Sequence, residues 1–299
     1  MTTTLITGAT GFTGRYLAAA LEQAGHAVVG LSHGPAESTV PGLTRTFACD
    51  LADLPRVRDI IEEVKPDHVV HLAAIAFVAH GDVEEMYRTN IVGTRHLLTA
   101  LQGCAGRLRS VLVASSANIY GNGRGGTLDE DTPPAPANDY GVTKVAAEYV
   151  CGVAGAQLPV IVARPFNYTG VGQSTSFLIP KIVDHVRRRA PVIELGNLDV
   201  ARDFSDVRTV VDAYARLLGT PAAIGRAVNV CSGRATSLAG VLDSVRRLSG
   251  HDFQVSVNPA FVRADEVKTL CGSPMLIESL IGPLTHIPLD DTLAWMLGA

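Results

Sequence analysis

Residues 5–14, LITGATGFTG, decide the fold because they join an apolar stretch to the start of a helical pattern. Within them, Gly8, Gly11 and Gly14 have the spacing of a dinucleotide-binding turn. Glycine lets the backbone turn tightly and approach a pyrophosphate, and the N-terminus of the following helix attracts the phosphates. Glycines elsewhere often mark ordinary turns. The strand before and the helix after this turn favour cofactor binding over a structural turn.

Short apolar runs alternate with helical patterns along the chain. Runs that are apolar on both faces are typical of a parallel sheet covered by helices on each side, and they occupy residues 4–7, 27–31, 45–49, 68–74 and 110–116. Helical spacing of apolar residues predicts helices over 16–24, 54–64, 86–101, 139–154 and 210–218, with further strands over 158–164 and 227–232. The repetition predicts an α/β fold with a Rossmann-type doubly wound parallel sheet.

The regular alternation weakens after residue 164, and glycine and serine gather over residues 170–176. We therefore expect a smaller α/β lobe that binds the substrate, formed by about 167–203 plus 233–299. The dinucleotide-binding domain is predicted over residues 1–166 plus about 204–232, because the helix and strand patterns of the second stretch return to it.

Composition limits the classes of protein to consider. With 47% hydrophobic and 18% charged residues, the chain is expected to form a globule rather than a disordered segment. A net charge of -4 gives no general attraction to nucleic acid or to anionic membranes, so neither is expected as a partner. The five cysteines contain no C-x-x-C pair, which argues against a disulfide framework and against a metal site. Neither a signal-peptide pattern nor an apolar run of bilayer-spanning length is found, and a cytoplasmic protein is expected.

The ends of the second and third predicted strands bear on the choice of cofactor. NAD-selective folds usually place Asp or Glu after the second strand to bind the ribose 2′-hydroxyl, but this chain has Ser32 and His33. A 2′-phosphate fits there with Ser32, His33 and Arg15 as donors, so NADP(H) is favoured and NAD(H) stays possible. Alternatively, Ser32 and His33 are ordinary loop residues. Asp50 is either an acceptor for the adenine amino group or the cap of the next helix.

A second group of polar residues combines Tyr140, Lys144 and Ser116. The spacing of four residues on the predicted helix 139–154 puts Tyr140 and Lys144 on one face, an arrangement that is common on helix surfaces. An ammonium group lowers the pKa of a nearby tyrosine and makes its hydroxyl a usable proton donor and acceptor. Ser116 ends the fifth predicted strand, at the carboxyl edge where ligands bind, and this companion favours a catalytic centre.

The sequence resembles the extended short-chain dehydrogenase/reductase family, the NAD-dependent epimerase/dehydratases, over nearly its whole length. The motifs are TGATGFTG (7–14), Asp50-Leu51, HLAA (71–74), TNIVGT (89–94), SSANIYG (115–121), YGVTK (140–144) and RPFNYTG (164–170). The resemblance implies that Ser116 binds the reacting oxygen, Tyr140 is the acid/base and Lys144 holds the nicotinamide ribose. It implies that Asn90 orients the helix of the active site, and that further cofactor contacts come from Gly8, Gly11, Phe12, Thr13, Gly14, Leu51, Leu72, Ala73 and Ala74.

Within that family, the chain is most similar to the branch of GDP-mannose 4,6-dehydratases and GDP-4-keto-6-deoxy-mannose reductases. The stretches are 164–173, 177–183, 193–207, 229–233 and 258–267. The similarity implies substrate contacts from Asn167, Lys181, Arg202, Arg263 and Glu266. Two arginines and a lysine suit a diphosphate, and a glutamate suits ribose hydroxyls. Arg202 alternatively pairs with Asp203, and residues 187–189 are expected to form a solvated helix face.

Asn118 narrows the reaction. Dehydratases of this branch carry a glutamate two residues after the catalytic serine or threonine, whereas an amide is no general base. We therefore expect a ketoreductase that passes a hydride to C4 of a GDP-linked 4-keto-6-deoxy sugar, with Asn118 beside the substrate. A nucleotide-sugar epimerase with retained cofactor uses the same residues and stays an alternative, as does a 4,6-dehydratase. A cofactor-sensing protein without catalysis is a further alternative. The family also implies a homodimer built through two helices per subunit.

Overall fold

The computed structural model describes residues 1–34, 40–76, 81–121, 126–262 and 267–299. Its centre is a parallel sheet of seven strands in the order β11-β7-β5-β4-β1-β2-β3. This order confirms the predicted doubly wound sheet, because it reverses between β1 and β4, where such folds bind dinucleotides. The strands are β1 (Thr2–Thr7), β2 (His26–Ser32), β3 (Arg45–Ala48), β4 (His68–His71), β5 (Ser110–Ala114), β7 (Val160–Pro165) and β11 (Ala227–Val230).

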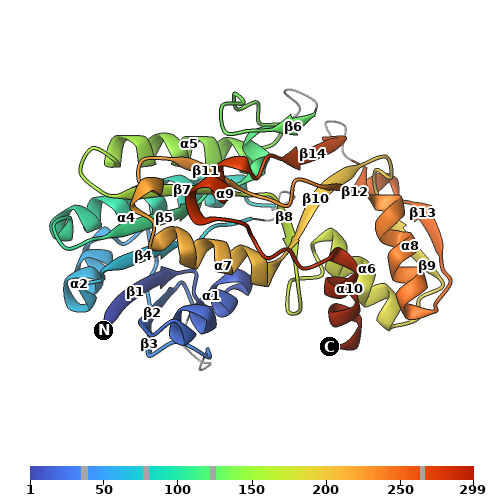
Figure 1. The fold of residues 1–299 in the computed structure, drawn as a ribbon, viewed down its shortest axis with the longest axis horizontal. Coiled ribbons are helices and arrows are strands. Elements are labelled where there is room, and N and C mark those ends of the chain that lie inside the picture. Colours follow the sequence, from blue (N-terminus) through green and yellow to red (C-terminus); the bar gives the residue numbers. More distant parts are fainter. Residues whose placement is uncertain (35–39, 77–80, 122–125, 263–266) are drawn as a thin grey trace.

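Helices cover both faces of this sheet (Figure 1). On one face, α2 (Leu54–Val64), α4 (Thr94–Leu101) and α5 (Asp139–Ala154) contribute Ile60, Leu97 and Cys151 to one buried apolar cluster. On the other face, α1 (Phe12–Gln23), α7 (Val207–Leu218) and α9 (Met275–Ile281) contribute to a second cluster. Burial from both sides explains why the strands read as continuous apolar runs.

Several strands end earlier, and one helix is more divided, than the sequence predicts. Strands β4 and β5 end at His71 and Ala114, so residues 72–74 and 115–116 form loops at the carboxyl edge. The predicted helix 86–101 consists of α3 (Val83–Tyr87), a π-helical turn (Arg88–Gly93) and α4. The wide turn contains Asn90, whose side chain is held by residues outside the helix, and π turns often mark functional sites.

A second group of strands and helices lies beyond the large sheet (Figure 1). One sheet has the order β12-β10-β14-β6, with β8 also paired to β10, and a two-stranded sheet joins β13 to β9. Its strands are β6 (Thr127–Leu128), β8 (Asn167–Thr169), β9 (Val192–Leu195), β10 (Ala201–Asp206), β12 (Ala235–Ser237), β13 (Gln254–Val257) and β14 (Thr269–Gly272).

Three helices, α6 (Leu178–Arg187), α8 (Leu238–Ser249) and α10 (Leu289–Gly298), enclose a third apolar cluster that includes Ile182, Val241 and Leu293. This cluster gives the predicted smaller lobe its own hydrophobic core. Strand β6, from residues 127–128, pairs with β14 of that lobe, and α9 packs instead with α7 on the large sheet. The proposed residue boundaries of the two domains stay a prediction. Among the described helices, none combines the length and the apolarity that a bilayer span requires.

Candidate active site

The glycine turn between β1 and α1 brings three segments into close contact. Gly8 has φ +69°, and a Cβ there would lie 2.8 Å from the Ala73 nitrogen of the loop after β4. A Cβ on Gly14 would lie only 2.3 Å from the Gly8 carbonyl oxygen. Gly11 is the N-cap of α1 and has no side-chain cap, so the N-terminus of the helix is left for another acceptor. This cradle fits the pyrophosphate of a dinucleotide.

The expected adenosine-side residues lie together where β2 and β3 end. Thr10 Oγ1 donates to Ser32 Oγ at 3.2 Å, and Arg15 Nε donates to the Thr10 carbonyl at 2.9 Å. His33 Nε2 is 3.7 Å from Asp50 Oδ2, and both side chains are exposed. Asp50 also accepts from the Ala52 N–H at 2.8 Å, whereas the side chain that caps α2 is Asp53. The alternative role of Asp50 as helix cap is therefore wrong.

The other predicted cofactor contacts lie at the start of α1, in the loop after β4 and beside the π turn. Thr13 Oγ1 is 2.8 Å from the hydroxyl of Tyr168, and the Phe12 ring stacks on Tyr168 with centroids 6.1 Å apart. The N–H groups of Leu72 and Ala73 bind the Thr7 carbonyl and hydroxyl oxygens at 3.1 and 3.3 Å. Leu51 is buried beside Gly93 of the π turn, and Ala74 is half-buried.

Ser116, Tyr140, Lys144 and Asn118 form a compact polar group at the carboxyl edge of β5. Ser116 and Tyr140 are both buried there, and the Ser116 side chain lowers the pKa of the Tyr140 hydroxyl. Asn118 donates to Ser116 Oγ through its side-chain Nδ2 at 3.1 Å and through its N–H at 3.2 Å. Lys144 Nζ donates to the Ala114 carbonyl at 2.9 Å and lies 5.7 Å from the centroid of the Tyr140 ring. The group therefore combines a phenol, two donors and a buried ammonium in one place.

Burial dominates the protonation of this group. It raises the pKa of Tyr140 above the ordinary value, although the Ser116 side chain acts in the opposite direction. Burial also lowers the pKa of Lys144 to about 8, against the opposing influence of Cys151 and Glu148. The expected net lowering of the Tyr140 pKa is therefore wrong for this structure, because burial raises the pKa. Tyr140 is consequently protonated at neutral pH.

Asn90 connects the π turn to the catalytic helix. Its Oδ1 accepts from the Ile75 N–H at 2.8 Å, and its Nδ2 donates to the Ile75 carbonyl and to Thr143 Oγ1, each at 3.0 Å. Thr143 in turn donates to the Tyr140 carbonyl at 2.8 Å. The amide thus fixes the loop after β4 against the first turn of α5.

His71 is a buried residue that sequence reasoning did not single out, although a polar side chain inside an apolar strand was a signal. Thr94 Oγ1 donates to the Asn90 carbonyl at 2.6 Å, so we infer that His71 Nε2 donates to Thr94 at 2.9 Å. Nδ1 then accepts from Thr7 Oγ1 at 2.7 Å. Burial lowers the pKa of His71 to about 3, which keeps the ring neutral. His71 therefore links Thr7 of β1 to Thr94 at the start of α4.

The expected substrate contacts come from several elements beyond the sheet. Asn167 is exposed on β8, and Arg202 on β10 donates to the carbonyl oxygens of Ala201 and Lys268 at 2.9 and 3.2 Å. Lys181 on α6 lies 3.7 Å from the centroid of the Phe261 ring, which is a contact that sequence reasoning missed. Burial lowers the pKa of Lys181. Arg263 and Glu266 lie outside the described residues.

Asp203 has partners that differ from the arginine suggested by the sequence. Its Oδ1 accepts from the N–H and hydroxyl of Ser232 at 2.9 and 2.6 Å, and its Oδ2 accepts from the Gly233 N–H at 2.9 Å. The carboxylate is fully buried. It therefore ties β10 to the loop after β11.

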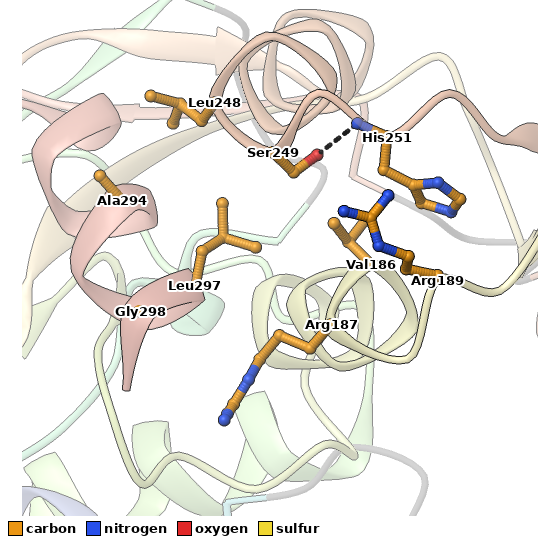
Figure 2. Close-up of a pocket in the computed structure, with 9 residues that line it drawn as sticks. All are labelled: Val186, Arg187, Arg189, Leu248, Ser249, His251, Ala294, Leu297 and Gly298. Carbon is orange, nitrogen blue, oxygen red and sulfur yellow. Dashed lines mark hydrogen bonds between the residues drawn. The ribbon is translucent and has the colours of Figure 1, made fainter.

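A separate surface pocket lies at the ends of α6, α8 and α10 (Figure 2). Arg189 lies beside His251 in this pocket, whereas Arg187 extends away from His251. The backbone N–H of His251 donates to Ser249 Oγ at 3.2 Å. Arg188 pairs with Asp184 at 2.6 Å. None of the pocket residues belongs to the polar group around Tyr140, so this pocket is distinct from the candidate active site.

Comparisons with known proteins agree with this geometry. Residues 4–231 match the model of the "NAD dependent epimerase/dehydratase family". The chain is 32% identical to GDP-6-deoxy-D-talose 4-dehydrogenase of Aggregatibacter actinomycetemcomitans, over 93% of this chain and 90% of that protein. It is 33% identical to GDP-6-deoxy-D-mannose reductase of Pseudomonas aeruginosa, over 97% of this chain and 90% of that protein.

A solved structure is similar over the whole chain. RMD from Pseudomonas aeruginosa, complexed with NADPH, superimposes with a TM-score of 0.85 at 29% identity and covers 100% of this chain and 98% of its own. Fold, glycine turn and family model thus agree on NAD(P)-dependent chemistry with nucleotide sugars. The chain belongs to the NAD-dependent epimerase/dehydratase family of extended short-chain dehydrogenases/reductases.

Proposed function

We propose that the protein reduces the 4-keto group of a nucleotide-linked 4-keto-6-deoxyhexose, GDP-4-keto-6-deoxymannose, with NADPH. The observation that carries this proposal is the polar group at the end of β5, in which Asn118 donates to Ser116 Oγ and the buried Lys144 lies 5.7 Å from the Tyr140 ring. Two relatives whose names refer to GDP-linked 6-deoxy sugars and to oxidation or reduction support the substrate class.

The residues of the polar group have complementary roles in this reaction. Bound NADPH supplies the hydride. Tyr140 carries a proton at neutral pH and delivers it to the oxygen that becomes the new hydroxyl. Ser116 donates to that oxygen and polarises the carbonyl, since Asn118 occupies the acceptor side of its hydroxyl. Lys144 holds the nicotinamide ribose and stabilises the charge that Tyr140 acquires.

Asn118 separates reduction from dehydration. The Asn118 side chain is half-buried and uses its Nδ2 group to donate to Ser116, so it offers no carboxylate to abstract a sugar proton. Reduction needs a proton donor and a group that polarises the carbonyl, and Tyr140 and Ser116 are suited to these two roles. Epimerisation uses the same residues with a retained cofactor. The site residues therefore do not separate the two reactions, and the experiment below does.

The nucleotide is proposed to bind along the smaller lobe, residues about 167–203 and 233–299. Asn167, Lys181 and Arg202 lie on three of its elements, and Arg263 and Glu266 are proposed to complete the contacts. Two cations and a further arginine suit a diphosphate. For the cofactor, NADPH is favoured over NADH because Ser32, His33 and Arg15 gather where the 2′-phosphate would lie.

A homodimer is also proposed, through the outer faces of α4 and α5. Tyr149 and Val153 on α5 are 72% and 82% exposed, and Val142 on α5 and Val92 in the π turn before α4 are exposed as well. Apolar side chains repeated along one helix face indicate a surface that another chain covers. The family resemblance implies a homodimer through two helices per subunit, without naming them.

The test follows nicotinamide absorbance after GDP-4-keto-6-deoxymannose is added with NADPH and, separately, with NADH. Stoichiometric oxidation of NADPH is expected, and Tyr140→Phe should lower kcat about 100-fold to 10,000-fold, the usual contribution of general acid catalysis. The variant should bind NADPH as the wild type does. Isomerisation of the sugar without net oxidation of either cofactor would replace the reductase by the epimerase.

A further inference from the structure

We propose that the buried ion pair between Glu148 and Arg164 positions both halves of the catalytic group, the helix α5 and the turn at Ser116. This inference rests on the proposed function, since it assigns positioning residues to that site. Neither residue touches the reacting atoms in this proposal. Both act through Ser115, Lys144 and Tyr140.

The spacing along α5 places Glu148 on the catalytic face of the helix. Tyr140, Lys144 and Glu148 follow at intervals of four residues, so their side chains lie in one row. Tyr140 and Lys144 are buried, and only 16% of the Glu148 side chain is exposed. A carboxylate in this position needs a partner, because burying an unpaired charge is costly.

Arg164 on β7 supplies that partner in a two-pronged geometry. Its Nε donates to Glu148 Oε1 at 3.0 Å and its Nη2 donates to Oε2 at 2.7 Å. Such a fork fixes orientation as well as distance. The contact therefore fixes the position of the middle of α5 relative to β7.

The remaining arginine group extends the contact to two further elements. Nη1 donates to the Tyr120 hydroxyl at 2.9 Å and to the Glu130 carbonyl at 3.1 Å. The Tyr120 hydroxyl donates to Asn229 Oδ1 on β11 at 2.7 Å. Tyr120 follows the turn that contains Ser116 and Asn118. The arginine thus connects the end of that turn at Tyr120 to β7.

Ser115 completes the connection to the catalytic serine. Its hydroxyl donates to Glu148 Oε1 at 2.5 Å, and its N–H donates to the Ala163 carbonyl of β7 at 2.7 Å. Ser116 is the next residue, so its backbone is anchored through the same carboxylate that anchors α5. A loss of this carboxylate should displace Ser116 and Tyr140 relative to each other.

The carboxylate also acts on the charge of Lys144. Glu148 and Cys151 favour the protonated ammonium, while burial opposes it. The other groups around Lys144 are Tyr140, which is neutral, and His71, which burial keeps neutral at a pKa of about 3. Replacing Glu148 by an amide leaves the Arg164 cation without its partner, so the pKa of Lys144 should fall further.

The experiment measures NADPH and NADH binding by fluorescence titration across pH, without substrate, and then steady-state reduction of the keto sugar. Glu148→Gln should lower kcat about 10-fold to 100-fold, as expected for reacting groups displaced by about 1 Å, with less change in the KM for the sugar. The pH at which cofactor binding weakens should move below that of the wild type. Arg164→Lys keeps the charge and loses the fork, so its kcat should fall while the pH midpoint stays near wild type.

Controls separate positioning from loss of the fold. Asp184→Asn breaks an exposed ion pair on α6 and should change neither readout. If Glu148→Gln does not fold, the double variant Glu148→Leu/Arg164→Met removes both charges together and leaves none unpaired. Wild-type kcat and wild-type pH midpoint in a folded variant would overturn the inference. If the wild type binds cofactor but does not reduce the sugar, the proposed function fails, while the binding midpoints still decide the role of Glu148.

Discussion

At the scale of single residues, the proposed reduction depends on the protonation states of Tyr140 and Lys144. Burial keeps Tyr140 protonated, which suits a group that gives up a proton during reduction. The same burial lowers the pKa of Lys144 to about 8 and so brings its titration close to the working range. One environment therefore has opposite consequences for a neutral acid and for a cation.

The lowered pKa of Lys144 predicts a pH limit. As pH rises through about 8, Lys144 loses its proton, the charge that stabilises the Tyr140 phenolate disappears, and kcat/KM should fall up to about tenfold per pH unit. Rates measured from about pH 6 to about pH 10 check this, with Lys144→Met as a variant that lacks the limb. A profile that stays flat well above pH 8 would contradict the assignment.

His33 predicts the preference for the phosphorylated cofactor. Its exposed ring lies at the end of β2 beside Asp50, and His33→Ala should raise the KM for NADPH about tenfold while the KM for NADH changes little. This size corresponds to one hydrogen bond to a charged group, about 1.5 kcal/mol. Initial rates with both cofactors measure it. His286→Ala replaces another exposed histidine and should leave both values unchanged.

At the scale of elements, the turn from β1 into α1 depends on the absence of a side chain. Gly14→Ala would place a methyl group 2.3 Å from the Gly8 carbonyl oxygen and 2.7 Å from Ala9 backbone atoms, so the turn must open. We expect a loss of stability of about 1–3 kcal/mol. Cofactor affinity should fall with it, because the helix end moves away from the pyrophosphate.

Thermal unfolding and cofactor titration of Gly14→Ala check this expectation. Gly152→Ala is the matched control, because a Cβ at this exposed position of α5 meets no atom within 4 Å. It should leave binding unchanged and stabilise the helix by about 0.5–1 kcal/mol. Equal stability and equal cofactor affinity of the two variants would show that the close approach of Gly14 to the backbone of Gly8 and Ala9 is unimportant.

Periodicity predicted most elements of the large sheet, and the bounds of α2 and α5 match the predicted ranges 54–64 and 139–154. It did not predict the π turn, because the apolar spacing of 86–101 continues through it and the extra width depends on contacts of Asn90 with Ile75 and Thr143.

Motifs indicated Ser116, Tyr140 and Lys144. The roles of His71 and Glu148 were not visible, since their partners are distant in sequence.

At the scale of the whole molecule, the proposed homodimer makes a prediction about the mass of the protein in solution. A dimer through α4 and α5 would cover the apolar face on the outside of the catalytic helix, and so stabilise α5 from the side opposite the sheet. Tyr149→Glu/Val153→Glu puts two charges on that face, which should prevent association.

Light scattering coupled to size-exclusion chromatography measures this prediction. The wild type should have twice the 31.5 kDa mass of one chain, and the double variant should have the mass of one chain. Val257→Glu on β13 changes an exposed apolar residue away from α5 and should stay dimeric. A wild type with the mass of a single chain would refute the dimer.

The cluster of Phe12, Tyr16, Tyr168 and Trp295 has a consequence for folding. The Trp295 ring on α10 lies edge-on to Tyr16 at 6.1 Å, and Tyr16 is part of the helix that follows the glycine turn. Arg208 lies 4.1 Å above the same indole. Helix α1 therefore completes its packing only when α10, which is distant in the sequence, has folded against it. A chain truncated before α10 should bind the cofactor less tightly than the chain that contains it.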